Sequence, residues 1–336
     1  MVGVGIVGLG FGTAVHVPAW RLDKRAKVVA VCGRDPANTQ KKADELGLEA
    51  LDFESMLARR DIQVLSLAVP PHSQPALIES AARAGKHLFC EKPLASNLAA
   101  AQRAWEVVAQ SSIRHGIDLL FPELPAWQAA HDCLPRLGPL KHLHLSWLLE
   151  SRAFRDQLVS WKTSLFEGGG AIGNFASHSL HYLEWLGGKV QRVLAWSTAD
   201  PAQQAHAQLL LQLDHQVQAS LTMAADAFQG SGHRLEIYGR QGALRLLNNS
   251  GDFARGFHLE EATREVPKWR TVVAPEVGEG DGRIEPVGRL VSRLLDCIQA
   301  DRPMHPGLAE GLRIQALLEA AGRSLREERW VEVGHD

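Results

Sequence analysis

The most constraining feature of the chain is a glycine-rich turn close to its start. Gly8, Gly10 and Gly12 follow an apolar, β-branched run that predicts a buried strand at Val4–Val7, and a helical pattern follows the turn. Glycines permit a tight turn and a close approach to the backbone, and the free N–H groups at a helix start attract an anion. The start of the chain therefore predicts a strand–turn–helix unit with an anion-binding turn.

This turn has the spacing of a dinucleotide-binding motif. Gly8 permits the tight turn, Gly10 lets the backbone approach a pyrophosphate, and Thr13 stands where a third glycine is common. We therefore expect Gly8, Gly10, Phe11, Gly12 and Thr13 to bind the cofactor, and Pro18 to shorten or kink the helix. The alternative is a strand-to-helix turn with no ligand.

Residues 1–120 continue with short β-branched runs that alternate with helical patterns, as in a doubly wound parallel sheet. Asp35 and Gly47 mark the ends of the second helix. The expected strands are Val4–Val7, Lys27–Cys32, Val64–Ala68, His87–Glu91 and about Arg114–Asp118. We predict an N-terminal Rossmann domain over residues 1–120.

The end of the second expected strand bears on the choice of cofactor. Arg34 stands where a ribose-binding acid or a basic residue for a 2′-phosphate is expected, and Asp35 is committed to capping the next helix. Arg34 can pair with a 2′-phosphate, which favours NADP over NAD without excluding NAD. The alternative for Arg34 is a solvated surface residue.

The chain changes character after residue 120. Longer alternating segments indicate a large mixed, mostly antiparallel sheet, and two helical stretches and a short strand close the chain. We predict a C-terminal α+β domain over residues 121–336, so that the fold class is α/β with two domains. The alternating segments include Leu140–Leu149, Val193–Ser197, His206–Leu213, Gln216–Met223 and Arg234–Tyr238; the helical stretches are about Val287–Gln299 and Gly307–Leu325, and the final strand is Trp330–Val333.

Composition narrows the class of partner. The 36 basic and 38 acidic side chains are well mixed, so neither nucleic acid nor a membrane surface is an expected partner. The four cysteines lack metal-ligand spacing, which predicts free thiols in the cytoplasm and no metal site. A small polar molecule is the expected partner.

Cys90-Glu91-Lys92-Pro93-Leu94 is the most specific motif. With Ala84-Gly85-Lys86-His87 before it and Val69-Pro70-Pro71-His72 further upstream, the first 120 residues resemble the Gfo/Idh/MocA family of glucose-fructose oxidoreductase and inositol dehydrogenase. Gly168-Gly169-Gly170 through His178 is similar to that family's entry to its active-site helix. Together these blocks cover most of the chain.

The resemblance implies roles for several residues of the first domain. It implies that Lys92 faces the nicotinamide and hydrogen-bonds the substrate hydroxyl that becomes a carbonyl, at the carboxyl edge of the sheet. The alternative for Lys92 is an ordinary surface lysine after a strand. The resemblance also makes Pro70, His72 and Glu91 candidates for binding the cofactor. Glu91 either orients Lys92, contacts the nicotinamide, or pairs with its neighbour for structural reasons alone.

The resemblance also implies an acid–base site in the second domain. Asn174 and His178 are four residues apart, on one face if helical, and His178 is the candidate proton acceptor. The alternative for His178 is a buried histidine with its hydrogen bonds satisfied. Family members commonly carry Asp where this chain has Asn174. An amide cannot stabilise an imidazolium as a carboxylate does, so either Lys92 carries more of the proton transfer, the reaction is slower, or catalysis is lost.

Four further residues are candidates for binding substrate. Lys162 stands where relatives often have a basic residue, and Trp161 is placed to wall the pocket. Glu123 and Trp127 follow the last strand of the first domain. Each of the four is as well explained by packing or by surface exposure.

The leading functional hypothesis is hydride transfer between a nicotinamide cofactor and a secondary alcohol or ketone carbon of a sugar, polyol or derivative. The departure at Asn174 keeps open a non-catalytic, nicotinamide-bound sensor or scaffold. A lyase or glycosidase that uses transient oxidation, as in some relatives, is a third hypothesis. The resemblance further implies a homodimer or homotetramer formed through the large sheet.

Overall fold

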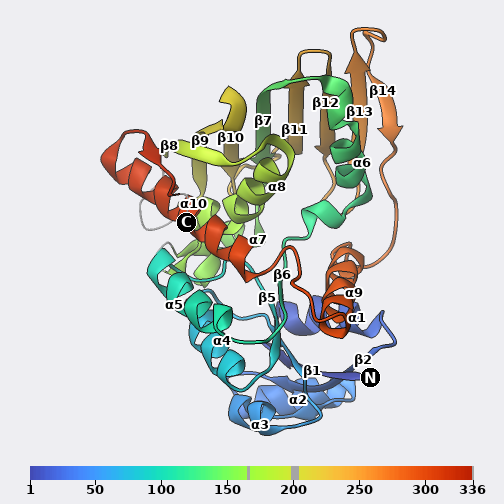
Figure 1. The fold of residues 1–336 in the computed structure, drawn as a ribbon, viewed down its shortest axis with the longest axis vertical. Helices are drawn as coiled ribbons and strands as arrows, with labels where there is room; N and C mark the ends of the chain where they lie inside the picture. The colour runs from blue at the N-terminus through green and yellow to red at the C-terminus, as the bar shows by residue number, and fades with distance from the viewer. Residues whose placement is uncertain (165–166, 198–203, 335–336) are drawn as a thin grey trace. The chain divides into compact units, whose positions relative to one another are not determined.

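The structure is a computed structural model that describes residues 1–164, 167–197 and 204–334 (Figure 1). It divides into two compact units. The first contains Met1–Leu120 and Arg283–Leu312, and the second contains Phe121–Gly282 and Arg313–Asp336. The segment Arg283–Leu312, which we expected in the second domain, belongs to the first unit because its helix α9 (Ile284–Gln299) packs against α1 (Val17–Arg21) and β5 (His87–Cys90).

The first unit is built on a six-stranded parallel sheet, which confirms the predicted Rossmann fold. The strand order is β3-β2-β1-β4-β5-β6, so the order reverses between β1 and β4. The strands are β1 (Val2–Val7), β2 (Ala26–Cys32), β3 (Glu49–Ala50), β4 (Val64–Leu67), β5 (His87–Cys90) and β6 (His115–Ile117). The short β3 was not among the expected strands.

Helices connect the successive strands, with α1 and α2 packed against β2 and with α4 packed against α5. The strands are buried from both sides, as their Val-, Leu- and Phe-rich composition requires. The helical elements are η1 (Gly12–His16), α1 (Val17–Arg21), α2 (Pro36–Leu46), α3 (Phe53–Ala58), α4 (Gln74–Arg83) and α5 (Leu98–Ala109). The turn η1 is π-helical, and Pro18 stands at the start of the short α1 that follows.

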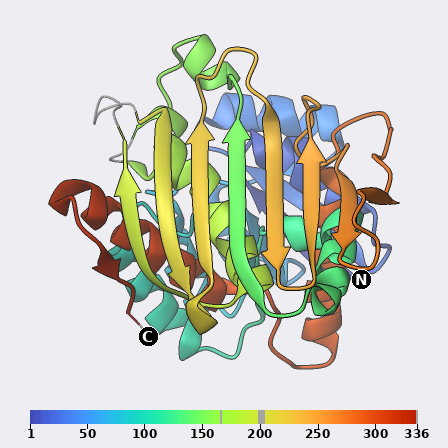
Figure 2. The ribbon, with the colours of Figure 1, turned by 90° about the horizontal axis from the view of Figure 1, so that it is seen from above.

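The second unit is built on a nine-stranded sheet of order β14-β13-β12-β11-β7-β10-β9-β8-β15 (Figure 2). Among the described strands only β7 and β10 pair in parallel, so the sheet is mixed and mostly antiparallel as predicted. The strands are β7 (Leu140–Leu148), β8 (Val190–Trp196), β9 (His206–Leu213), β10 (Gln218–Ala224), β11 (Gly232–Gly239), β12 (Gly242–Asn248), β13 (His258–Thr263), β14 (Arg270–Val273) and β15 (Val331–Glu332).

Strands β12, β13 and β14 were not among the segments named from the sequence, and β13 shows one reason. Its Glu261 is fully buried, at a position where alternation requires an apolar residue. The carboxylate of Glu261 accepts a hydrogen bond of 2.7 Å from Nε of Arg136 and one of 2.5 Å from Nη2 of Arg270. Two arginines thus compensate a buried charge that no local pattern reveals.

The remaining helical elements of the second unit include α8 (Ser177–Gly187), which packs on β7. The others in the described part of this unit are η2 (Phe121–Glu123), α6 (Pro125–Cys133), η3 (Leu134–Leu137), α7 (Arg152–Arg155), η4 (Trp161–Thr163), η6 (Ile172–Ala176) and η7 (Asp214–Gln216). Helix α10 (Leu308–Glu327) begins in the first unit and continues in the second. No helix among the described residues has the length and apolarity needed to cross a bilayer.

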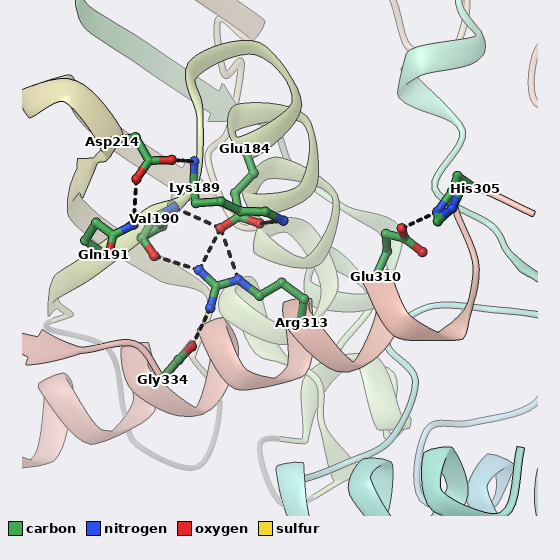
Figure 3. Close-up of polar contacts among 9 residues, drawn as sticks. All are labelled: Glu184, Lys189, Val190, Gln191, Asp214, His305, Glu310, Arg313 and Gly334. Atoms are coloured by element: carbon green, nitrogen blue, oxygen red, sulfur yellow. Dashed lines mark hydrogen bonds and ion pairs between the residues drawn. The ribbon is translucent and has the colours of Figure 1, made fainter. Parts of the chain in front are cut away.

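An ion-pair network ties α10 to α8 and β8 within the second unit (Figure 3). Nη2 of Arg313 donates to Oε1 of Glu184 over 2.9 Å and to the carbonyl oxygen of Val190 over 2.6 Å. Nη1 of Arg313 donates to the carbonyl oxygen of Gly334 over 2.7 Å. The Glu184 side chain is only 8% exposed, so Arg313 compensates a largely desolvated charge.

Candidate functional site

The glycine turn lies at the point where the strand order of the first sheet reverses. Gly8 has a φ of +116°, and a Cβ built on it would lie 2.1 Å from the carbonyl oxygen of Ala68, at the end of β4. The N–H of Gly8 donates to the carbonyl of Cys32, at the end of β2. A Cβ on Gly10, in contrast, would meet open space. The turn is thus sterically restricted at Gly8 and accessible at Gly10, as an anion-binding turn requires.

Thr13 and Phe11 stabilise the helix that follows the turn. The Thr13 hydroxyl donates to the carbonyl oxygen of Leu9 over 2.6 Å, so it has a structural partner. The Phe11 ring lies edge-on to His16 at 5.3 Å, and the guanidinium of Arg283 lies over it at 4.9 Å. Phe11 thereby links the turn to the residue before α9.

The end of β2 matches the expectation for Asp35. Oδ1 of Asp35 accepts a hydrogen bond of 2.7 Å from the N–H of Asn38, which caps α2 and commits this carboxylate. Arg34 is exposed and makes no hydrogen bond or ion pair with any described residue. The cation at this strand end is therefore available to a ligand, whereas the acid is not.

The Glu91-Lys92-Pro93 turn directly follows β5 and is held by a buried glutamine. Nε2 of Gln74 donates to the carbonyl oxygens of Glu91 at 2.7 Å, Pro93 at 3.3 Å and Leu94 at 3.2 Å. The Lys92–Pro93 peptide bond is cis. Gln74 thus fixes the backbone on both sides of Lys92. His72 and Pro70 lie in the loop that leads to α4, where His72 is exposed and Pro70 is half-buried.

Three ionisable groups meet beside this turn. Nε2 of the fully buried His16 lies 3.1 Å from Oε1 of Glu91 and 3.9 Å from Oδ2 of Asp118. Nδ1 of His16 lies 2.9 Å from Oγ of Ser66, which also accepts a hydrogen bond from Nε1 of Trp20. One ring nitrogen of His16 and one carboxylate oxygen each of Glu91 and Asp118 all lie within 4.8 Å of one another.

The protonation of the three groups follows from their mutual charges. Burial by itself lowers the pKa of His16, but the adjacent carboxylates of Asp118 and Glu91 outweigh burial and raise that pKa to about 9. Burial together with the charge of Glu91 raises the pKa of Asp118 to about 7. Burial also opposes ionisation of Glu91, yet His16 and Lys92 hold the pKa of Glu91 below its usual value.

The candidates of the second unit lie around its glycine run. A Cβ on Gly169 would lie 1.8 Å from the carbonyl oxygen of Trp161, so the Trp161–Lys162 turn packs directly on this run. Asn174 is half-buried in η6, and His178 is 5% exposed in α8. The structure thus brings Trp161 and Lys162 next to the segment that leads to Asn174 and His178.

An aromatic cluster supports His178. The ring of Phe121 lies 5.1 Å from that of His178 and 5.0 Å from that of Trp127. Trp127 is fully buried and Glu123 is 3% exposed. Their burial favours the packing alternative for Trp127 and Glu123. Lys162 is exposed, with its Nζ 6.0 Å from the centroid of the Trp161 ring.

Comparison with known proteins identifies the family. Residues 2–117 match the profile described as "Oxidoreductase family, NAD-binding Rossmann fold", and residues 135–333 match that described as "Oxidoreductase family, C-terminal alpha/beta domain". Both are profiles of the Gfo/Idh/MocA family. The chain belongs to this family. The predicted resemblance is thereby confirmed.

Two curated Gfo/Idh/MocA relatives match over 98% of the chain. An uncharacterized oxidoreductase of Synechocystis is 30% identical, with 95% of that protein covered. Levoglucosan dehydrogenase of Pseudarthrobacter phenanthrenivorans is 25% identical, with 97% covered. Among solved structures, levoglucosan dehydrogenase in complex with NADH and L-sorbose superposes with a TM-score of 0.90 at 21% identity, covering 100% of this chain and 99% of that one.

Sequence reasoning located the turn and the Glu91-Lys92-Pro93 motif but missed Gln74, His16 and Asp118. Gln74 reads as an ordinary residue at a helix start, and its role depends on the return of the chain after β5. Asp118 ends the last expected strand, at the carboxyl edge where ligands of parallel sheets bind, so its position was a signal that could have been used.

Proposed function

We propose that the chain catalyses hydride transfer between the C4 atom of NAD(P) and a secondary alcohol or ketone carbon of a sugar, polyol or derivative. The observation that carries the proposal is the sterically restricted glycine turn at the strand-order reversal, in the same sheet as the Glu91-Lys92-Pro93 turn at the end of β5. Membership of an oxidoreductase family supports it.

In the proposed reaction the nicotinamide, when bound, accepts or supplies the hydride. Lys92 hydrogen-bonds the substrate oxygen, and its direction is set by the backbone that Gln74 holds. In oxidation, the carbinol carbon loses a hydride and the hydroxyl loses a proton, which passes to Lys92 or His178. Asn174 hydrogen-bonds the substrate or the imidazole.

The other candidates have secondary roles. Gly8, Gly10, Phe11, Gly12 and Thr13 form the pyrophosphate turn. Pro70, His72 and Glu91 line the cofactor, and Trp161 and Lys162 bind substrate hydroxyls or a carboxylate. Glu123 and Trp127 are buried, and Trp127 belongs to the aromatic cluster around Phe121 that supports His178.

The test is a screen of polyols and keto-sugars with NAD(H) and NADP(H), followed at the absorbance of the reduced nicotinamide. The variant Lys92→Ala is expected to lose about 10²- to 10⁴-fold in kcat and to bind NADH as tightly as the wild type does. Lys41→Ala, which removes an exposed lysine of α2, is the control. Full activity of Lys92→Ala refutes the role of Lys92.

The named relatives are oxidoreductases, which favours catalysis over the sensor or scaffold alternative. Tight NADH binding without turnover of any compound in the screen would instead favour that alternative. A reaction in which the cofactor stays bound and returns to its starting state would point to the lyase or glycosidase mechanism.

For the cofactor we propose a preference for NADP over NAD. The support is the exposed Arg34 beside an Asp35 that is committed to its helix cap. Charge-assisted hydrogen bonds contribute about 1.5 to 3 kcal/mol, so Arg34→Ala should weaken NADPH binding by roughly tenfold or more. NADH binding should change by less than about twofold, and an equal loss for both cofactors excludes contact of Arg34 with a 2′-phosphate.

We also propose a homodimer or homotetramer that forms through the large sheet and works in the cytoplasm. Figure 2 shows the broad face of the sheet turned toward the viewer, with the helices of its unit behind it. Leu210 of β9 is 48% exposed and Tyr238 of β11 is 37% exposed, so apolar side chains lie on the sheet surface. The buried free thiols of the chain suit a reducing compartment.

A further inference from the structure

The cluster of His16, Glu91 and Asp118 has no role in the function proposed above beyond that of Glu91. It lies wholly within the first unit, where His16 comes from η1, Glu91 follows β5 and Asp118 follows β6. Its side chains are 0%, 14% and 2% exposed. Three ionisable groups in such a place require compensation, because an unpaired buried charge is strongly unfavourable.

Hydrogen-bond roles can be assigned around His16. The indole N–H of Trp20 can only donate, so Oγ of Ser66 accepts from it and has one lone pair and one proton left for Nδ1 of His16. The ionised Glu91 can only accept, so Nε2 of His16 carries a proton. His16 is therefore either the Nε2–H tautomer or the imidazolium, and both forms bind Glu91.

The two carboxylates compete for this one cation. Glu91 is the nearer, and Asp118 lies at ion-pair distance with its Oδ1 buried and without a hydrogen-bond partner among the described residues. The charge of Glu91 disfavours ionisation of Asp118, so the cluster can hold one proton in addition to those on His16. The cluster can therefore change its net charge by binding or releasing this proton.

The link to the reaction is Glu91. It is the neighbour of Lys92, whose charge in turn favours ionised Glu91. The other ionisable groups around the cluster are the Cys90 thiol, whose pKa burial and Glu91 raise, and Arg283, which lies over the Phe11 ring that contacts His16. His16 lies at hydrogen-bond distance from the Glu91 carboxylate, and Lys92 acts on that carboxylate through its charge.

We propose that His16 and Asp118 are positioning residues for the proposed oxidoreduction: together they fix the Glu91 carboxylate and set the net charge of the buried cluster next to Lys92. The inference rests on the proposed function. Glu91 transmits the effect, because its backbone leads directly into the Lys92 turn and its carboxylate interacts with the Lys92 charge.

The same three side chains could also hold a metal ion. The assignment above favours protons, because both ring nitrogens of His16 already have hydrogen-bond partners and a metal would have to displace one of them. Metal analysis of the purified protein decides between these readings. Stoichiometric zinc or another transition metal would overturn the proposal.

The kinetic test compares His16→Gln and Asp118→Asn through the pH dependence of kcat/KM, with the substrate that the wild type turns over. His16→Gln removes a positive charge and should raise the apparent pKa that describes the pH dependence of kcat/KM. Asp118→Asn removes a negative charge and should lower it. Each displacement should be roughly half a pH unit to one pH unit, with kcat reduced about 10- to 100-fold by misplacement of Lys92.

Gln74→Met is the matched control. It loosens the same turn without changing any charge, so it should lower kcat and leave the pH profile in place. Displacements of opposite sign in His16→Gln and Asp118→Asn support the proposal. No displacement, or displacement of both in one direction, overturns it, because a merely structural role predicts the behaviour of Gln74→Met.

A measurement on the wild-type protein covers the case in which a variant does not fold or no substrate is found. Nitrogen chemical shifts of His16 should report a proton on Nε2 from pH 6 to pH 8, and addition of NADH should shift its titration. A neutral Nδ1–H tautomer in this range, or a titration that NADH leaves unchanged, overturns the inference. Absence of turnover with these signals intact refutes the proposed function alone.

Discussion

Two alanine substitutions in the glycine turn separate stability from cofactor binding. Gly8→Ala places a Cβ 2.1 Å from the carbonyl oxygen of Ala68 at a φ of +116°. A non-glycine residue in such a conformation costs about 1 to 3 kcal/mol, and the overlap must be relieved by moving the end of β4. We expect a loss of about 3 kcal/mol in the free energy of unfolding, or a fall in Tm of about 6 to 12 °C.

Gly10→Ala should do the opposite. The φ of Gly10 is not positive, and its Cβ would meet no protein atom, so loss of unfolded-chain entropy should leave stability unchanged or raised by about 0.4 to 1 kcal/mol. The same Cβ would occupy the space that we propose for the pyrophosphate. NADH affinity should therefore fall by roughly tenfold or more, equivalent to about 1.4 kcal/mol.

The assay is calorimetric or fluorescence titration with NADH, together with thermal unfolding of each variant without ligand. We expect Gly10→Ala to be as stable as the wild type but to bind NADH more weakly, and Gly8→Ala to be less stable than the wild type. If Gly10→Ala binds NADH within about twofold of the wild-type affinity, the turn does not hold the pyrophosphate and the assignment of the cofactor site is wrong.

Three further predictions concern stability and assembly. Arg313→Leu should cost about 3 kcal/mol in urea denaturation because it leaves buried Glu184 without its main partner, whereas Lys189→Ala, whose side chain is 63% exposed, should change stability by less than about 0.5 kcal/mol. Because folding raises the pKa of His16 from 6.5 to about 9, its contribution to stability is complete below pH 6.5 and is lost as the pH rises through 9. The fall in unfolding free energy over this range should be smaller in His16→Gln. Leu210→Arg should convert the proposed oligomer into monomers in size-exclusion chromatography, and a wild type that elutes as a monomer contradicts that proposal.

The sheet of the first unit was predictable because its strands are buried on both faces and short turns separate them from their helices. The runs around Val4, Val64 and His87 need no distant partner to be recognised. Strand β3 was missed because it has only two residues, Glu49 and Ala50, which carry no periodicity.

The second sheet shows where local patterns fail. Strand β9 was predicted to the residue because it alternates clearly, whereas β13 contains the buried Glu261. That carboxylate depends on Arg136 and Arg270, which are far from it or on another strand. Compensation across such distances has no signature in the neighbouring sequence.

The candidate site divides in the same way. Motifs that act through their own backbone, such as the turn at Gly8 and the helix cap at Asp35, were predictable from spacing alone. His16, Asp118 and Gln74 act by meeting residues from other elements, and only the strand order brings them together. The burial of Trp127 was likewise not predictable from its neighbours in the sequence, because it depends on packing against Phe121 and Tyr182.

The return of residues 283–312 to the first unit has a consequence for synthesis on the ribosome. Six parallel strands are complete by residue 117, but α9, which packs on α1 and β5, is made only after about 180 further residues. At about 5 to 20 residues per second, the surface of α1 and β5 that α9 covers stays exposed to solvent for roughly 10 to 40 s. Chaperone capture of the emerging chain should therefore be strongest in this interval, and a fragment that stops near residue 120 should aggregate rather than fold.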